Sequence, residues 1–448
     1  MRSSSRNTGS VNESELFMER ARRSIAGGDS STMRVLRYAK PLVAARGGGC
    51  RIWDIDGNEY IDLNMSYGPL LFGHRHPRVG AAVMKQITER GSQLGYPTEI
   101  SVRVAEKIKR LFPSIDLLRF ANSGTEALAS AARLTRMHTG RSKLVLFEGH
   151  YHGWSEALFN RYHTPLQDLG DGPYAAGVPG TRGMTRALDD VYVCRWNDLE
   201  SLGAVFADHG PEIAGVVMEP VMGNAGVIAP TPGYLQAVRA LTQANGALLV
   251  FDEVITGLRV SAGGAQELFD VRPDITVISK ALGGGYPVAA FGASHEIMRH
   301  ITEGRLFHGG VYSGNALVMA AAEAVLDEIL EHREKLYEFL NETADSFAVE
   351  LSKLLVELEV PHVVQHVGPM LSLLLTDEHD VEISNYRDVA RRGQFDRYIQ
   401  LQHIAQGLGV LFHPNMFEPM FLSTAHSRTD MDAVLERLDA AARECLVG

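Results

Sequence analysis

Lys280 is the residue of this sequence best placed to attack a carbonyl group. It follows the apolar run Ile275–Ile278 and precedes Ala281-Leu-Gly-Gly-Gly285, so its amine lies where a buried strand gives way to flexible backbone. Burial disfavours the charged form of a lysine, lowers its pKa and yields the neutral amine that attacks carbonyls. A strand-end lysine that reaches solvent is the commoner case, so other residues must decide between the two interpretations.

Ser123, Gly124 and Thr125 could hold a phosphate. They open a predicted helix that runs through Ala127, and the backbone N–H groups at the positive end of a helix bind anions. The alternative is an ordinary helix N-cap, for which serine and threonine are common choices.

Asp252 and Tyr151 suit an aromatic ring that carries a nitrogen. Asp252 ends the apolar strand Leu248–Phe251, and so deep a carboxylate needs a cationic or strongly hydrogen-bonding partner, which a pyridinium nitrogen would supply. Tyr151 offers a face that could stack on a flat ring. Either could instead be structural, as a strand-end carboxylate and a core aromatic. Together with Lys280 and the phosphate site, they describe a binding site for pyridoxal 5'-phosphate (PLP).

The elements that must position these groups alternate along the chain from about residue 77. Short apolar runs separated by helical stretches predict an α/β fold, in which helices cover both faces of a mainly parallel sheet. The expected strands are Leu117–Phe120, Lys143–Phe147, Ala214–Met218, Ala247–Phe251, Ile275–Ile278 and Ala289–Ala293. Polar clusters follow five of these strands, and the carboxyl ends of strands are where open α/β sheets bind ligands.

Composition narrows the class of protein. The chain has 448 residues, of which 45% are apolar, and a net charge of −11. This balance argues against a nucleic-acid or anionic-membrane surface, and no apolar run is long enough to span a bilayer. Cys50, Cys194 and Cys445 are odd in number and lack metal-ligand spacing, so we expect neither disulfides nor a metal site and predict a cytoplasmic location.

The order of the motifs resembles the class III aminotransferases of the fold-type I PLP enzymes. Within that family the chain is most similar to glutamate-1-semialdehyde 2,1-aminomutase and the β-amino acid aminotransferases. The motifs that carry the resemblance are Gly27-Gly-Asp-Ser-Ser-Thr-Met-Arg34, Ser66-Tyr-Gly-Pro69, Asn122-Ser-Gly-Thr-Glu-Ala127, Glu148-Gly-His-Tyr-His-Gly153, Glu219-Pro-Val-Met-Gly-Asn224, Asp252-Glu-Val-Ile-Thr-Gly257, Lys280 with Gly283-Gly-Gly285, Ser313-Gly-Asn315, and Phe417-Glu418 with Ser423-Thr-Ala-His-Ser427.

The resemblance implies a role for each candidate residue. Lys280 would form the Schiff base with PLP, be released from it by the substrate amine, and then act as the catalytic base and acid. The other cofactor-binding residues would be Ser123, Gly124 and Thr125 at the phosphate, Asp252 at the ring nitrogen, Tyr151 and Val254 on the two ring faces, and Asn224 at the ring hydroxyl. Arg34 would bind a substrate carboxylate, with Tyr67 and Glu418 lining the substrate side.

The order of the predicted elements indicates two domains. A large PLP-binding domain with a mainly parallel, seven-stranded sheet would span residues 76–324. A smaller α+β domain would be built from residues 1–75, which include a hairpin around Asp56-Gly57, and from residues 325–448, with a long helix over Met319–Glu331 at the junction. The family resemblance implies that the chain forms a homodimer with shared active sites.

Three departures from the family pattern bear on the reaction. Val311 stands where a threonine typically contacts the phosphate of the neighbouring subunit's cofactor, and Tyr67 replaces the tryptophan of the aminomutase motif. The segment Trp154–His163 lacks the small Gly/Ser-rich gating loop of the aminomutases. We therefore predict an aminotransferase that moves an amino group from a carboxylate-bearing donor, such as a β-amino or secondary-metabolite amino acid, to an oxo acceptor. The alternatives are the aminomutase and a PLP-binding protein without catalysis.

Overall fold

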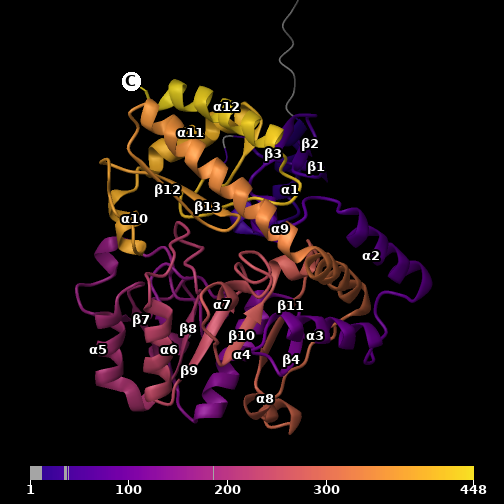
Figure 1. The fold of residues 1–448 in the computed structure, drawn as a ribbon, viewed down its shortest axis with the longest axis vertical. Helices are drawn as coiled ribbons and strands as arrows, with labels where there is room; N and C mark the ends of the chain where they lie inside the picture. The colour runs from indigo at the N-terminus through magenta and orange to yellow at the C-terminus, as the bar shows by residue number, and fades with distance from the viewer. Residues whose placement is uncertain (1–12, 35–37, 39, 185, 448) are drawn as a thin grey trace, which may run out of the picture.

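A computed structural model describes residues 13–34, 38, 40–184 and 186–447 of the chain. The lower part of the molecule in Figure 1 holds the large sheet, and the upper part holds two small sheets together with the C-terminal helices.

The large sheet has eight strands in the order β4-β11-β10-β9-β8-β5-β7-β6. The six strands expected from apolar runs are all present: β4 (Leu117–Ala121), β5 (Lys143–Phe147), β8 (Ile213–Met218), β9 (Leu248–Glu253), β10 (Ile275–Ile278) and β11 (Ala289–Ala293). β7 (Val191–Cys194) is the seventh, and the short β6 (Tyr174–Ala176) adds an eighth at the edge, so the expected count of seven was one too low. Among neighbouring strands only the pairs β10–β11, β11–β4 and β6–β7 are antiparallel, so the predicted α/β fold with a mainly parallel sheet is confirmed.

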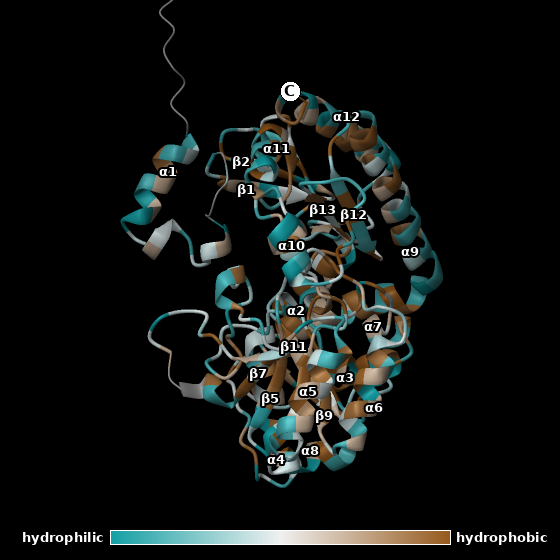
Figure 2. Ribbon diagram, turned by 90° about the vertical axis from the view of Figure 1, so that its left-hand side faces the viewer, coloured by the Kyte–Doolittle hydropathy of each residue, from teal (hydrophilic) through white to brown (hydrophobic). Residues whose placement is uncertain are grey.

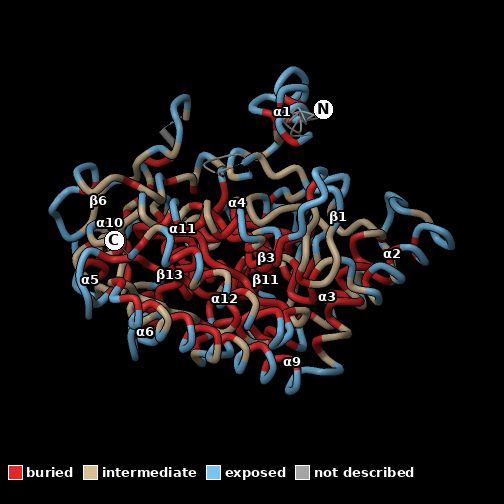
Figure 3. The backbone as a smooth tube through the Cα atoms, turned by 90° about the horizontal axis from the view of Figure 1, so that it is seen from above, coloured by how far each residue is buried: buried red, intermediate tan, exposed pale blue. Residues whose placement is uncertain are grey.

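Helices bury both faces of this sheet, which explains its nearly continuous apolar strands. Along β5, Leu144 and Leu146 pack in the core that includes α4 (Gly124–Thr139) and α8 (His295–Thr302). The alternate residues Val145 and Phe147 pack in the core that includes α5 (Leu199–His209) and α6 (Tyr234–Ala244). In Figure 2 the strands of this sheet are brown between more polar helices, and in Figure 3 the buried residues occupy the middle of the molecule.

The rest of the chain forms two small sheets. One has the order β1-β2-β3-β14 and the other β12-β13-β15. Their bounds are β1 (Ala44–Gly48), β2 (Arg51–Asp54), β3 (Glu59–Asp62), β12 (His362–Val367), β13 (Met370–Leu375), β14 (Val410–Leu411) and β15 (Met420–Phe421). β2 and β3 pair antiparallel and form the predicted hairpin.

The other helices are α1 (Glu13–Arg22), α2 (Pro77–Glu89), α3 (Glu99–Leu111), α7 (Gly264–Leu268), α9 (Ala316–Glu357), α10 (Tyr386–Arg392), α11 (Phe395–Gly407) and α12 (Arg428–Cys445). α9 is far longer than the predicted Met319–Glu331, and it bends at His332, whose backbone is not helical. The first part of α9 packs in one hydrophobic core and its last part in another. The domain boundaries at residues 75 and 324 stay a prediction. No helix in the described ranges is long and apolar enough to cross a membrane.

Candidate active site

A cavity of about 630 Å³ lies where the parallel strands of the large sheet end. Every candidate residue from the sequence lines it: Arg34, Tyr67, Ser123, Gly124, Thr125, Tyr151, Asn224, Asp252, Val254, Lys280 and Glu418. They come from segments up to 384 residues apart in sequence, counted from Arg34 to Glu418. The structure thus brings the residues of the predicted site together, and the individual role of each residue stays a prediction.

Lys280 lies two residues after the end of β10 and adopts a left-handed backbone conformation, with φ of 40°. Such a conformation costs a non-glycine residue free energy and is concentrated at functional sites. Burial lowers the pKa of the Lys280 amine, the carboxylates of Glu418, Glu219 and Asp252 oppose this shift, and the Arg259 guanidinium adds to it. The amine therefore loses its proton more readily than an exposed lysine, as attack on a carbonyl requires.

Asp252 is 3% exposed at the end of β9. One carboxylate oxygen lies 2.8 Å from Nδ1 of His152, and the other accepts a hydrogen bond of 3.0 Å from the backbone N–H of Val254. The buried carboxylate therefore has the strong partners that its position demands. The sequence motif contains His152, but its pairing with Asp252 became evident only in the fold.

Ser123 is the N-cap of α4, since its hydroxyl accepts a hydrogen bond of 3.2 Å from the backbone N–H of Glu126. The cap and the anion site are compatible, because the first N–H groups of a helix have no partner within the helix. The backbone at Gly124 also approaches Val254 closely: a Cβ atom there would meet a Val254 methyl group at 3.0 Å. Gly124 thus lets the helix end and the Val254 side of the cavity come together.

Glu219 is a buried carboxylate that sequence reasoning noted only as part of a polar cluster. It accepts hydrogen bonds from the Tyr151 backbone at 2.7 Å, the Gly223 backbone at 2.8 Å and the Asn224 side-chain amide at 2.8 Å. Because the amide NH₂ of Asn224 is bound in this way, its carbonyl oxygen remains to accept from a ligand. Glu219 therefore positions two candidate cofactor-binding residues at once.

The substrate side of the cavity is built differently. The Arg34 side chain is 54% exposed, and its Nε lies 3.0 Å from the Asp29 carboxylate. The Tyr67 hydroxyl donates a hydrogen bond of 2.8 Å to the backbone carbonyl of Met33. Glu418, in contrast, is buried, and burial raises its pKa to about 7, against the lowering effect of the Lys280 charge.

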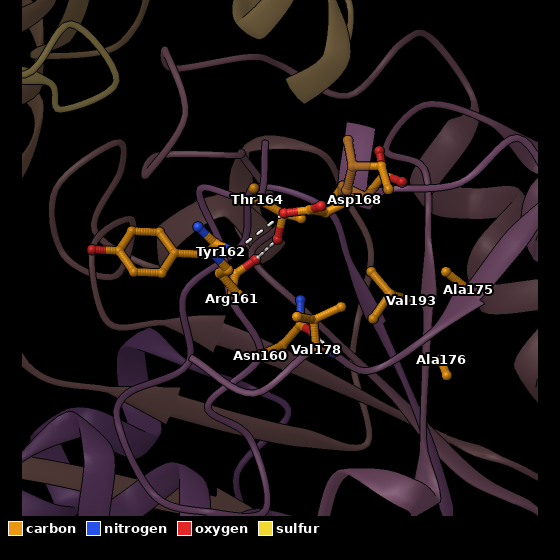
Figure 4. Close-up of a pocket in the computed structure, with 12 residues that line it drawn as sticks. Asn160, Arg161, Tyr162, Thr164, Asp168, Ala175, Ala176, Val178 and Val193 are labelled. Carbon is orange, nitrogen blue, oxygen red and sulfur yellow. Dashed lines mark hydrogen bonds and ion pairs between the residues drawn. The ribbon is translucent and has the colours of Figure 1, made fainter. Parts of the chain in front are cut away.

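Tyr162 also lines the cavity, and sequence reasoning did not single it out. Its ring centroid lies 4.8 Å from that of Tyr151. Figure 4 shows a separate crevice of about 10 Å³, which Tyr162 lines together with Thr164 and Asp168. The ring of Tyr162 points away from the other two side chains. That crevice is too small for a substrate and lies within the connection between β5 and β7.

The sequence model of the family "Aminotransferase class-III" matches residues 35–441. The chain belongs to this family. A glutamate-1-semialdehyde 2,1-aminomutase of Desulfitobacterium hafniense is 41% identical over 424 residues, which cover 93% of this chain and 95% of that relative. Among solved structures, an omega-transaminase from Sphaerobacter thermophilus has a TM-score of 0.89 at 30% identity, covering 98% of this chain and 99% of that one.

A glutamate-1-semialdehyde aminomutase from Pseudomonas aeruginosa, solved in complex with PMP, has a TM-score of 0.85 at 26% identity and covers 97% of this class-III chain and 94% of its own. The predicted resemblance is confirmed. The chain is a PLP-dependent enzyme, and the alternative of a PLP-binding protein without catalysis is not supported.

The residues present fit PLP. The positive end of the 16-residue helix α4 suits its phosphate, and the Asp252 carboxylate suits a protonated ring nitrogen. The lowered pKa of Lys280 suits a bond to the aldehyde carbon. Among the described residues no group of three or more His, Cys, Asp or Glu side chains could hold a metal ion.

Proposed function

We propose that the enzyme is an aminotransferase that takes the amino group of a carboxylate-bearing donor and passes it to an oxo acceptor. The observation that carries this proposal concerns the segment from Arg161 to Gly170, which follows Tyr151, a residue of the cavity wall. Hydrogen bonds from the side chains of a neighbouring helix hold this segment in place. An aminomutase must keep its intermediate until nitrogen returns to it, whereas an aminotransferase must release a keto product. A fastened segment favours release.

Side chains of α10 hold this segment. The Tyr386 hydroxyl donates to the Thr164 carbonyl at 2.7 Å, and the Arg387 guanidinium donates to the Gly170 carbonyl at 3.0 Å. Arg387 is itself fixed by a bidentate pair with Glu148, with distances of 2.7 and 2.9 Å. Glu148 is 4% exposed, and breaking such a buried pair is costly. Opening and closing over a substrate would require these contacts to break.

The residues of the cavity account for the transfer. When bound, PLP stabilises negative charge on the substrate carbon that bears nitrogen. Asp252 would keep the ring nitrogen protonated, while Arg34 would orient the substrate through its carboxylate. Nζ of Lys280 would accept the proton from the substrate carbon and donate it to the cofactor carbon on the other side of the nitrogen, which its lowered pKa favours.

The aminomutase is the second candidate, and two observations favour it. The 41% identical relative bears that name. In addition, Glu418 is a buried carboxylate near Lys280, and it could hold a second amino group of a diamine.

One experiment separates the two reactions. The purified holoenzyme is incubated with 3-aminobutanoate and either pyruvate or 2-oxoglutarate, and in parallel with glutamate 1-semialdehyde alone. We expect the aminated acceptor to form in the first reaction. Failure to form it, together with conversion of glutamate 1-semialdehyde to its isomer, would overturn the proposal in favour of the aminomutase.

A homodimer is the expected active unit. Four large side chains of the segment 307–312 and of the neighbouring residue 96 are exposed on the described surface. Their exposed fractions are 82% for Tyr96, 86% for Phe307, 80% for Val311 and 65% for Tyr312. Gln93 donates a hydrogen bond to the Val311 carbonyl, which joins the two segments that carry them. Exposed aromatic groups of this size suit a protein interface. An active monomer in a sedimentation experiment would contradict the dimer. The cytoplasmic location also stays a prediction.

A further inference from the structure

The turn Met65–Gly68 has an unusual backbone. Met65, Ser66 and Tyr67 have φ values of 45°, 58° and 66°, and Gly68 follows at 107°. Consecutive non-glycine residues rarely adopt the left-handed region, and such conformations persist only where surrounding contacts impose them. Ser66 and Tyr67 both line the cavity, so the strained turn lies at its wall.

Two sets of contacts impose this conformation. Within the turn, the Asn64 side chain accepts from the Tyr67 backbone at 2.6 Å, and Asp62 accepts from the Met65 backbone at 3.1 Å. From outside, Arg259 donates a hydrogen bond to the Gly68 carbonyl.

Burying the charged side chain of Arg259 costs the folded state free energy. It is fully buried, and no carboxylate of a described residue forms an ion pair with it. Its guanidinium donates to the carbonyls of Gly68 and Leu422, the latter at 3.1 Å, and lies 5.0 Å from the centroid of the Phe421 ring. Since an unpaired buried charge is strongly unfavourable, its two backbone contacts indicate a positioning role.

The turn is connected to the substrate side through Tyr67. The Tyr67 hydroxyl donates to the carbonyl of Met33 at 2.8 Å, and Nε2 of His413 lies 3.3 Å from the same oxygen. Met33 immediately precedes Arg34, whose Nε faces Asp29. Within the described part of the chain no residue binds the two terminal nitrogens of the Arg34 guanidinium, so they can bind a carboxylate in a bidentate manner.

We propose that Tyr67, held by the left-handed turn and by Arg259, is a positioning residue that fixes Arg34 for the carboxylate of the donor. The proposal rests on the proposed function only in assuming that the donor bears a carboxylate. A tryptophan at position 67 would lack the hydroxyl that reaches Met33, so this contact is a specificity-determining feature of the chain.

The test replaces one hydroxyl and compares two donors with the same carbon skeleton. In Tyr67→Phe, loss of the hydrogen bond to the Met33 carbonyl, and of the one that Tyr67 shares with the Tyr38 hydroxyl, should raise the half-saturating concentration of 3-aminobutanoate about 5- to 10-fold. The maximal half-reaction rate of the variant should stay within about 2-fold of the wild type. For 2-aminobutane, which lacks the carboxylate, neither quantity should change. Equal effects on both donors, or no effect on either, would overturn the proposal.

A second readout does not depend on turnover. Calorimetric titration with glutarate, a dicarboxylate without an amine, should show a similar loss of affinity in Tyr67→Phe, about 5- to 10-fold. Tyr174→Phe is the matched control, because Tyr174 lies on β6 outside the cavity and its hydroxyl donates to Asp208 on α5. This variant should bind glutarate as the wild type does. If the wild type released no keto product, the proposed function would fail, while an unchanged glutarate affinity in Tyr67→Phe would refute the positioning role.

Arg259→Met tests the other end of the connection. It should weaken glutarate binding in the same direction, and combining it with Tyr67→Phe should add little, since both changes disturb one chain of contacts. Fully additive losses would show that Arg259 does not act through Tyr67. Should Arg259→Met fail to fold, the Tyr67→Phe titration alone decides.

Discussion

The floor and the rim of the cavity are held in different ways. On the floor, Asp252 and Glu219 are 3% and 2% exposed, and each is bound by groups from other strands or loops. On the rim, the Arg34 side chain is 54% exposed, and its ion-pair partner Asp29 is five residues away in the same segment. Floor groups cannot move without uncovering buried charge, whereas rim groups can.

The buried groups of the floor suit the chemical step, and the exposed groups of the rim suit the choice of substrate. Buried, multiply bound groups keep a fixed orientation, which suits a cofactor whose chemistry does not vary. Exposed groups held by one or two contacts can be replaced at little cost in stability. Relatives named as an aminomutase and as an omega-transaminase are both similar to this chain, which fits a shared floor with a variable rim.

The largest expected effect comes from the floor. Lys280→Ala removes the amine that would bind PLP and move the proton, so the turnover rate should fall by at least about 1000-fold while the fold is kept. Steady-state assays and thermal unfolding would measure both. Lys353→Ala, at a side chain 64% exposed on α9, is the control and should retain full activity. A Lys280→Ala variant that transaminates at the wild-type rate would refute the assignment.

Asp252→Asn keeps the shape of the side chain but removes its charge. Because preorganised electrostatic groups are each worth about 100- to 1000-fold, we expect the half-reaction rate to fall by at least about 100-fold. The side-chain oxygen of asparagine can still accept from His152, so the fold should persist. Asp439→Asn on α12, whose carboxylate pairs with Arg443, is the control. A rate within about 3-fold of wild type would show that the Asp252 charge is not needed.

Much of the floor could be predicted from sequence, for a physical reason. Asp252 lies at the end of one apolar strand and Lys280 two residues after another, and parallel strands of one sheet bring their ends together. β7 was not among the expected strands, although its four residues, Val191–Cys194, equal the length of the predicted β10. Its partner β6 has only three residues and exists through pairing with β7.

Arg259 and Glu219 could not be assigned roles from sequence. An arginine two residues after Gly257 resembles a solvent-exposed cation, and only the packing of Phe421 and the Gly68 turn reveals that it is buried. Likewise, the three groups that bind Glu219 lie on two separate loops. Such roles depend on contacts between distant segments, which local patterns do not encode.

Glu418, a buried carboxylate on the substrate side of the cavity, makes the stability of the protein depend on pH. Its raised pKa means that the folded protein binds the proton more tightly than the unfolded chain, so this group makes the free energy of unfolding fall as pH rises from about 4.5 to about 7. Glu418→Gln removes that loss. The cofactor-free variant should gain up to about 3 kcal/mol relative to wild type between pH 5 and pH 8, measured by urea unfolding. Glu350→Gln on α9 is the control, and an equal change in both variants would contradict the assignment.

The smallest expected effect lies on the rim, at Asp29. Its ion pair with Arg34 is largely exposed, and such pairs contribute at most about 1 kcal/mol. Asp29→Ala should therefore raise the half-saturating concentration of 3-aminobutanoate by no more than about 5-fold, and by less in 1 M salt, which screens exposed charges. Asp29→Asn should stay near wild type, because its amide oxygen can still accept from Arg34 and from the Ser31 backbone. If Asp29 instead competes with the donor carboxylate for Arg34, both variants would bind the donor more tightly. That result would make the rim a site of inhibition by the chain's own carboxylate rather than one of orientation.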